Sequence, residues 1–336
     1  MVHEALLYEK EAGNRVRCGL CAHRCRIDPG RRGVCGVREN REGFLYSLVY
    51  GPILTENVDP IEKKPLFHVL PGSQSFSIAA AGCNFRCSFC QNHEISQMPR
   101  EKGRIVGRER TPAQIVEMAL QSGSKSIAYT YTEPTIYFEF AYDTAGFARE
   151  KGLKNVFVTN GFMTPGMLML IAPRLDAANV DLKAFRDDFY QKQCGARLQP
   201  VIDSLRKMKE LGIWVEVTTL LIPGLNDGEV ELRELAAFIV SLGAETPWHI
   251  SRFYPQYRMT EQPSTPAGSI HRAGEIGRSA GLKYVYSGNI PGDAGENTHC
   301  ARCGRLLIGR YGFSIERLDL KGSACPHCGT TLEGIF

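Results

Sequence analysis

The chain has 336 residues, of which 43% are hydrophobic and 23% charged, and its formal net charge is +4. So small a charge does not by itself indicate binding to nucleic acid or to a membrane surface. No stretch reaches the roughly 18 consecutive apolar residues that a membrane-spanning helix needs. The N-terminal residues lack the basic and then apolar pattern of a signal peptide, so we expect a cytoplasmic protein.

Residues 1–50 are predicted to form a small metal-binding module, with four cysteines at the spacing Cys-x2-Cys-x3-Cys-x9-Cys. Tight cysteine pairs in a protein without a signal peptide favour metal ligation, and disulfides are the alternative. The quartet suits either zinc or a second iron–sulfur cluster, with zinc slightly favoured and His23 as a substitute ligand. The ligands are Cys18, Cys21, Cys25 and Cys35.

Residues 51–290 are predicted to form the main domain, in which strand-like and helix-like segments alternate. We expect strands at 75–81, 126–130, 154–158, 176–182, 213–220 and 247–253. We expect helices at 112–122, 135–150, 165–172, 199–212, 229–242 and 268–280. Six strand–helix units predict an α/β fold with a parallel sheet and right-handed crossovers. Because a closed barrel needs eight units, a partial (β/α)6 barrel fits best, and an open doubly wound sheet is the alternative.

A loop directly after the first predicted strand carries Cys83, Cys87 and Cys90 at the spacing Cys-x3-Cys-x2-Cys. Three thiolates can hold a cubane iron–sulfur cluster and leave one of its irons without a protein ligand. A zinc site completed by His93 is the alternative. In a parallel barrel this loop lies at the carboxyl ends of the strands, so we expect a reactive site here.

Polar residues also follow the next three predicted strands. Glu133 follows the second strand, Asn160 the third, and Asp181 and Lys183 the fourth. Because the carboxyl ends of parallel strands meet at one edge, we expect these side chains beside the three cysteines. Each has a structural alternative. Glu133 could be a helix N-cap, Asn160 could belong to an ordinary Asn-Gly turn, and Asp181 and Lys183 could form a solvated salt bridge.

The cysteine loop, with the aromatic Phe89 before its last cysteine, resembles the signature of the radical SAM enzymes. The resemblance implies a [4Fe-4S] cluster whose open iron binds S-adenosylmethionine (SAM) and a 5′-deoxyadenosyl radical that abstracts hydrogen from a substrate. It places Glu133 at the SAM amino group, although Tyr131 and Thr132 replace the two glycines of the family's element. It also implies reduced flavodoxin or ferredoxin as the electron donor.

Thr159-Asn160-Gly161 and Asp181-Leu182-Lys183 are similar to motifs of the glycyl-radical activating enzymes, such as pyruvate formate-lyase activating enzyme. By this resemblance Asn160 and its neighbour Thr159 contact SAM. Asp181 helps to hold a monovalent cation near the SAM carboxylate, and Lys183 points into the site. The resemblance also implies that the substrate is a protein or peptide.

Three further candidates lie in the last two predicted strands. By resemblance to the activating enzymes Thr219 contacts the adenosine, and a buried strand is the alternative. His249 and Arg252 end the sixth strand and are expected to reach SAM or the substrate, with a structural histidine as the alternative. The proposed catalytic residues are Asp181, Lys183 and His249.

Residues 291–336 are predicted to form a C-terminal module with the spacing Cys-x2-Cys-x21-Cys-x2-Cys. Two such pairs form a zinc ribbon or a rubredoxin-like iron site, and we favour zinc. The ligands are Cys300, Cys303, Cys325 and Cys328, while Cys194 stands alone.

Nearly the whole chain resembles the AmmeMemoRadiSam system radical SAM proteins, on residues 20–25, 59–67, 130–134 and 284–289. Two other functions stay open. One is a non-catalytic iron–sulfur sensor or zinc-ribbon nucleic-acid binder, which would explain the metal-rich ends but not the polar strand ends. The other is a radical SAM enzyme that acts on a small molecule.

Overall fold

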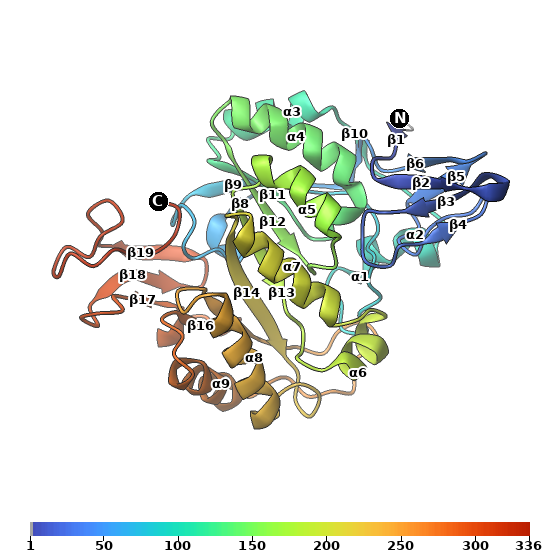
Figure 1. Ribbon diagram of the computed structural model, residues 1–336. Coiled ribbons are helices and arrows are strands. Elements are labelled where there is room, and N and C mark those ends of the chain that lie inside the picture. Colours follow the sequence, from blue (N-terminus) through green and yellow to red (C-terminus); the bar gives the residue numbers. More distant parts are fainter. Residues whose placement is uncertain (1–2) are drawn as a thin grey trace.

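The computed structural model describes residues 3–336 and centres on an eight-stranded sheet (Figure 1). Seven strands are parallel, and β8 pairs antiparallel with β9 at one edge. The order is β16-β15-β14-β13-β12-β11-β9-β8, so within the described residues the two edge strands do not pair and the barrel stays open. The strands are β8 (Thr55–Pro60), β9 (Gln74–Ala79), β11 (Ser126–Tyr129), β12 (Lys154–Thr159), β13 (Ala177–Asp181), β14 (Trp214–Leu221), β15 (Trp248–Arg252) and β16 (Val285–Gly288).

Helices connect successive parallel strands, and Figure 1 shows several of them side by side along one face of the sheet. The predicted partial barrel is therefore confirmed, with β16 as one parallel strand more than the six expected. The connecting helices are α3 (Pro112–Gln121), α4 (Phe138–Glu150), α5 (Pro165–Ile171), α7 (Gln199–Glu210), α8 (Glu229–Leu242) and α9 (Ala267–Ser279).

Local sequence signals set where two of these helices begin. The Thr111 side chain accepts a hydrogen bond from the Gln114 backbone N–H, and the Gln114 side chain accepts one from the Thr111 backbone N–H, which completes a capping box at α3. Thr164 caps α5 in the same way, through the backbone N–H of Met167. Both helices then carry a proline at their first position, where its missing N–H costs nothing.

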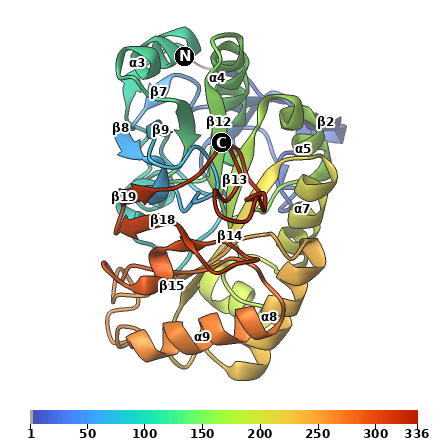
Figure 2. The ribbon, with the colours of Figure 1, turned by 90° about the vertical axis from the view of Figure 1, so that its left-hand side faces the viewer.

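The two cysteine-rich ends of the chain lie on opposite sides of the main sheet in Figure 1. The N-terminal part contains two small antiparallel sheets, and its Cys21 bridges to Met163 beyond the end of β12. The C-terminal sheet faces the viewer in Figure 2. After this sheet, the backbone N–H of Ile335 donates a hydrogen bond to the carbonyl of His68 at the other end of the barrel. The strands are β1 (His3–Glu4), β2 (Tyr8–Glu11), β3 (Arg15–Cys18), β4 (Arg26–Ile27), β5 (Arg38–Arg41), β6 (Phe44–Ser47), β17 (Thr298–His299), β18 (Leu306–Tyr311) and β19 (Ser314–Leu318).

Short elements complete the fold. They are β7 (Pro52–Ile53), β10 (Arg108–Glu109), α1 (His93–Ser96), α2 (Met98–Glu101), α6 (Asp187–Phe189) and the 3-10 turn η3 (Pro134–Tyr137). Over residues 3–336, no helix combines the length and the apolar character that crossing a bilayer requires.

Candidate active site

A cavity of about 540 Å³ opens at the carboxyl ends of the parallel strands. Its volume lies within the range of about 300–1,000 Å³ that is usual for small-molecule sites. Nine of the residues predicted from the sequence line it together: Cys83, Cys87, Cys90, Phe89, Glu133, Thr159, Asn160, Asp181 and Lys183. The fold therefore gathers the candidates from four strand ends in one place.

The cysteine loop follows β9 and is held by a distant segment of backbone. The N–H of Arg86 donates to the carbonyl of Cys194 at 2.8 Å, and the N–H of Ser88 donates to Gln193 at 2.9 Å. The sulfur of Cys83 accepts from the Phe85 N–H at 3.3 Å. Donors of this kind stabilise thiolates and tune the potential of a cluster that they bind.

A single zinc ion needs a compact set of sulfur ligands. In a tetrahedral zinc site with bonds of about 2.3 Å, sulfur atoms lie about 3.8 Å apart. Among residues 3–336, the group of His, Cys, Asp or Glu whose ligand atoms all lie within 4.8 Å of one another is the C-terminal quartet. The Cys83 trio, with or without His93, does not form such a group in the part of the chain that the structure describes.

Glu133 organises the neighbouring strand ends from a buried position, with 1% of its surface exposed. Its Oε1 accepts from the Thr159 hydroxyl at 2.7 Å and the Thr135 hydroxyl at 2.6 Å, and its Oε2 accepts from the Asn160 N–H at 2.8 Å. Burial raises the pKa of Glu133, although these hydrogen bonds oppose the shift. The carboxylate thus holds the Thr159–Asn160 turn in place and brings negative charge to the cavity wall.

Asn160 links this turn to the cysteine loop. Its Nδ2 donates to Asn84 Oδ1 at 2.8 Å and lies 3.8 Å from the sulfur of Cys83. Its Oδ1 accepts from the Phe162 N–H at 3.0 Å, as expected of an Asn-Gly turn. The Asn160 side chain therefore stabilises the turn and also contacts the cysteine loop.

Asp181 and Lys183 form an ion pair at the mouth of the cavity, with Nζ 3.0 Å from Oδ2. The Lys183 side chain is 13% exposed and that of Asp181 is 36% exposed. Burial alone would lower the pKa of Lys183, but the Asp181 carboxylate and the sulfur groups of Cys87 and Cys194 together outweigh it and raise that pKa. Lys183 is therefore a fixed positive charge, and the pair is partly enclosed and not a freely solvated salt bridge.

Three predicted residues do not line this cavity. Thr219 points to the opposite face of β14, where its hydroxyl donates to the Leu182 carbonyl at 2.9 Å. Arg252 likewise turns away and donates to the Thr265 carbonyl at 2.7 Å. Because side chains alternate along a strand, the neighbours Thr218 and Ser251 take these places at the cavity.

His249 lies below the cavity floor, inside the barrel. It is 3% exposed, and its Nε2 lies 2.7 Å from Glu216 Oε2. Glu216 also accepts hydrogen bonds from the backbone N–H groups of Phe67 and His68. Burial raises the pKa of Glu216, but the nearby His249 and His68 rings outweigh this effect and lower it. The geometry thus supports the structural alternative for His249 and not contact with a ligand in the cavity.

Sequence reasoning missed Cys194, Thr218 and Lys64. Cys194 is fully buried behind Cys87 and hydrogen-bonds its sulfur, which together with burial raises the pKa of the Cys87 thiol. The hydroxyl of Thr218 is buried at the cavity without a partner, as a hydrogen-bonding group awaiting a ligand would be. Only strand alternation relative to Asp181, which pairs with Thr218 across the sheet, could have identified Thr218.

Lys64 reaches the cavity from the segment between β8 and β9. Its Nζ lies 2.7 Å from Asp59 Oδ2 and 4.5 Å from the centre of the Tyr131 ring. Tyr131 also donates its hydroxyl to Asp59 and adopts a left-handed φ of 60°. These contacts hold the Lys64 ammonium group at the cavity.

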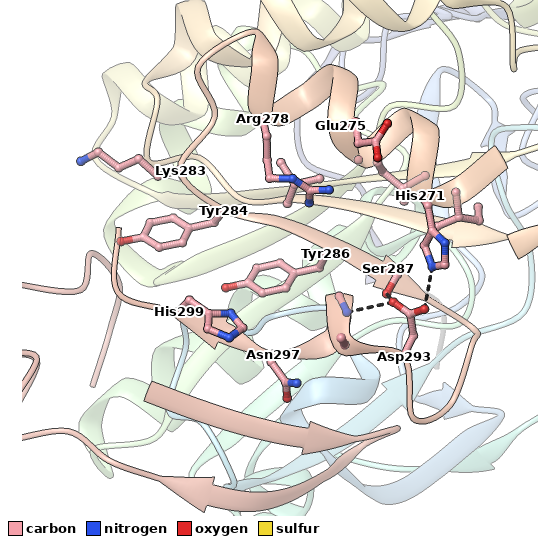
Figure 3. A pocket seen from close by; sticks show the side chains of 16 residues that line it. His271, Glu275, Arg278, Lys283, Tyr284, Tyr286, Ser287, Asp293, Asn297 and His299 are labelled. Atoms are coloured by element: carbon pink, nitrogen blue, oxygen red, sulfur yellow. Dashed lines mark hydrogen bonds and ion pairs between the residues drawn. The ribbon is translucent and has the colours of Figure 1, made fainter. Parts of the chain in front are cut away.

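A further cavity of about 570 Å³ lies between α9, β16 and the C-terminal sheet (Figure 3). Its side chains include His271 and Asp293, whose Nε2 and Oδ2 lie 2.6 Å apart. None of the predicted site residues, all of which the structure describes, lines it. It is separate from the cavity at the strand ends.

Comparison with known proteins agrees with the site. A sequence model of the radical SAM superfamily matches residues 77–236. The chain is 47% identical over 335 residues to an uncharacterized protein of Methanocaldococcus jannaschii, covering 99% of each chain. It is 25% identical over 168 residues to the pyruvate formate-lyase-activating enzyme of Clostridium pasteurianum, covering 48% of this chain and 67% of that one.

The fold also matches a solved structure. A radical SAM methyltransferase from Sphaerobacter thermophilus superposes with a TM-score of 0.52 at 19% identity, covering 67% of this chain and 70% of the other. At this identity the match establishes a shared fold, whereas the chemistry at the cavity depends on the residues described above.

Proposed function

Because this chain belongs to the radical SAM superfamily and is an enzyme of that class, we propose that it abstracts hydrogen from a protein or peptide substrate. The observation that carries the proposal is the cavity in which three cysteines of one loop meet Asn160 and the Asp181–Lys183 pair. Relatives named pyruvate formate-lyase-activating enzyme support a macromolecular substrate. The open edge of the barrel supports it too, because a chain segment could enter there.

The residues present fit the cofactors that the family implies. Cys83, Cys87 and Cys90 would hold the [4Fe-4S] cluster, since all three line the cavity and three thiolates leave one iron open. The unpartnered hydroxyl of Thr218 fits a polar ligand such as SAM in the same cavity. When bound, cluster and SAM supply hydrogen-atom abstraction after one-electron reduction.

The chain's own groups orient the ligand by charge. Glu133 brings a negative charge to the wall and is proposed to attract the SAM ammonium. Lys183 holds a positive charge, suited to the SAM carboxylate, and Asp181 fixes the position of that lysine. Phe89 covers the cluster side of the cavity and excludes water. A monovalent cation beside Asp181 remains a proposal, as does a role for the C-terminal quartet in binding structural zinc.

One experiment tests the enzyme and its substrate class together. The protein is reconstituted anaerobically with iron and sulfide, reduced with dithionite and given SAM, and 5′-deoxyadenosine is quantified. A dialysed, protein-rich fraction of a cell extract should stimulate its release, and the dialysable fraction should not. Stimulation by the dialysable fraction alone would contradict a protein substrate and favour the second candidate.

That second candidate is a radical SAM enzyme that acts on a small molecule. Relatives named GTP 3′,8-cyclase, 26% identical over 44% of this chain in Listeria welshimeri, favour it. A new organic radical or crosslink carried on a protein after the reaction would decide against it.

A further inference from the structure

A basic hollow lies where the N-terminal, cysteine-rich part of the chain meets the main domain. Its volume is about 450 Å³, and Arg17 and Arg24 line it from the N-terminal side while Arg197 lines it from the segment before α7. Within residues 3–336, none of these three guanidinium groups is ion-paired with a carboxylate. Among the lining residues, all of which the structure describes, Asp203 alone is acidic. The hollow therefore carries positive charge that the chain itself does not neutralise.

The hollow reaches the cysteine loop from outside the catalytic cavity. His23 lines the hollow, and its Nε2 lies 2.9 Å from the carbonyl oxygen of Asn84, the residue after Cys83. The hollow and the cavity at the strand ends have no lining residue in common. A partner seated on the hollow would thus touch the cysteine loop and leave the cavity free for its own ligands.

Two more arginines add positive charge beside this contact. Arg86 is an exposed member of the cysteine loop, and Arg100 donates a hydrogen bond to the Phe85 carbonyl. Burial lowers the pKa of the His23 ring, and the positive charges of Arg197, Arg100 and Arg86 lower it further, so these guanidinium groups lie around the ring. We call the whole set the basic surface: Arg17, Arg24, Arg86, Arg100 and Arg197.

The position of the basic surface selects the kind of anionic partner that it fits. Under the proposed function SAM and substrate occupy the catalytic cavity, so the electron for the cluster must arrive from elsewhere. Electron transfer slows steeply with distance, and the basic surface is one hydrogen bond away from the cysteine loop. Weak electron-transfer complexes need only a small interface, below about 1,200 Å². A nucleic-acid interface would call for a broader excess of positive charge than the chain's net +4.

We propose that the basic surface docks an acidic one-electron carrier protein, which reduces the cluster through the Asn84 side of the cysteine loop. The carrier loses one electron and the cluster gains it, and no bond forms or breaks. Attraction between the carrier's carboxylates and the arginines raises the rate of encounter. This inference rests on the cluster of the proposed function, and it adds where the electron enters.

Binding is measured first, because it does not depend on the reaction. The probe is an acidic flavodoxin, added to the anaerobically reconstituted wild type and to full-length R24E/R197E. We expect weak binding to the wild type that falls as salt is added, and a loss of about tenfold or more in the variant at low salt. R272E/R278E makes the same charge change on α9, on the opposite side of the main sheet in Figure 1, and should bind as the wild type does.

The rate of cluster reduction is then compared for two reductants. Reduced flavodoxin or reduced methyl viologen, a small cation, is mixed with each protein, and samples frozen at intervals are analysed by electron paramagnetic resonance (EPR). R24E/R197E should slow reduction by flavodoxin by about tenfold or more. Reduction by methyl viologen should be unchanged or faster, because a small cation needs no docking. Equal slowing with both reductants would show a distorted cluster site and would overturn the proposal.

The remaining outcomes also decide. If charge reversal unfolds the protein, R24Q removes one exposed charge and should still weaken binding of flavodoxin at low salt. Binding that ignores these substitutions would refute the docking surface, as would tighter binding of duplex DNA at the same arginines. SAM cleavage driven by methyl viologen would then leave the proposed function standing. Conversely, charge-dependent docking and reduction in a protein that never cleaves SAM would refute the proposed function and leave this inference intact.

Discussion

The buried thiol of Cys194 hydrogen-bonds the sulfur of Cys87 from behind the cysteine loop. Cys87 lines the cavity and Cys194 does not. Cys194 therefore lies beside a proposed cluster ligand and is not itself one of the three. The backbone carbonyl of Cys194 also accepts a hydrogen bond from the backbone N–H of Arg86, which lies in the cysteine loop. Cys194 thus shapes the loop through its carbonyl, and its sulfur is the hydrogen-bond partner of Cys87. Once Cys87 binds iron and has lost its proton, only the Cys194 thiol can donate in this pair.

Replacing Cys194 should change the potential of the catalytic cluster without removing it. A hydrogen bond of about 0.5–1.5 kcal/mol corresponds to roughly 20–60 mV for one electron. C194A should therefore lower the reduction potential by that order, and C194S, which keeps a donor, should lower it less. EPR-monitored redox titration measures this; lost iron in C194A would instead identify Cys194 as a ligand.

Removing the charge of Glu133 should weaken SAM binding. In E133Q an amide group faces donors such as the Asn160 N–H, so the turn is displaced and the negative wall is lost. Hydrogen bonds to charged groups are worth about 1.5–3 kcal/mol, which corresponds to roughly 10–100-fold in affinity. Equilibrium binding to the reconstituted protein measures the effect. The exposed E150Q, at the end of α4, is the matched control and should bind normally.

The left-handed backbone of Gly161 allows a comparison of two glycine-to-alanine variants. Gly161 has a φ of 69°, and an added Cβ would lie 2.8 Å from a Val180 side-chain carbon. G161A should destabilise the protein by about 1–3 kcal/mol and move Asn160, which lowers SAM affinity. G166A, near the start of α5 with nothing within 4 Å of the added Cβ, should leave both unchanged. Equal thermal midpoints for the two variants would contradict the argument.

The lowered pKa of Lys64 predicts that the free energy of unfolding rises with pH. Burial lowers the pKa of Lys64 to about 8 from 10.5, although Asp59 opposes the shift. Because the unfolded lysine keeps its proton where the folded one has lost it, unfolding becomes less favourable as pH rises from about 8 toward 10.5. Between about pH 7.5 and 9.5 the wild type should gain about 2 kcal/mol relative to K64M. Thermal midpoints of both proteins across this range measure it, and a constant difference would exclude it.

Metal removal should destabilise the C-terminal sheet and spare the [4Fe-4S] cluster. Cys300 and Cys325 pack in one hydrophobic group with Phe67, Tyr284 and Tyr286, which ties this sheet to the barrel. C303A, or a zinc chelator, should lower the thermal midpoint while acid-labile sulfide stays constant. Loss of sulfide along with the metal would show instead that the quartet holds a cluster.

Most of the barrel could be predicted because its signals are local. The capping box at Thr111, the six apolar runs and the helices between them depend on residues a few positions apart, and all appear in the structure. β16 was not predicted, and β8 was missed because its largely exposed pattern lacks a continuous apolar run. The proposed domain boundaries at residues 50 and 290 remain predictions.

The sequence by itself determined that three cysteines follow the first barrel strand and that polar residues end the next three, since parallel strands carry such residues to one edge. Only the tertiary structure decided that Thr218 and not Thr219 faces the cavity, and that His249 lies beneath its floor. It alone placed Cys194 against Cys87. These facts depend on strand faces and on contacts between segments far apart in the chain, where no local pattern carries the information.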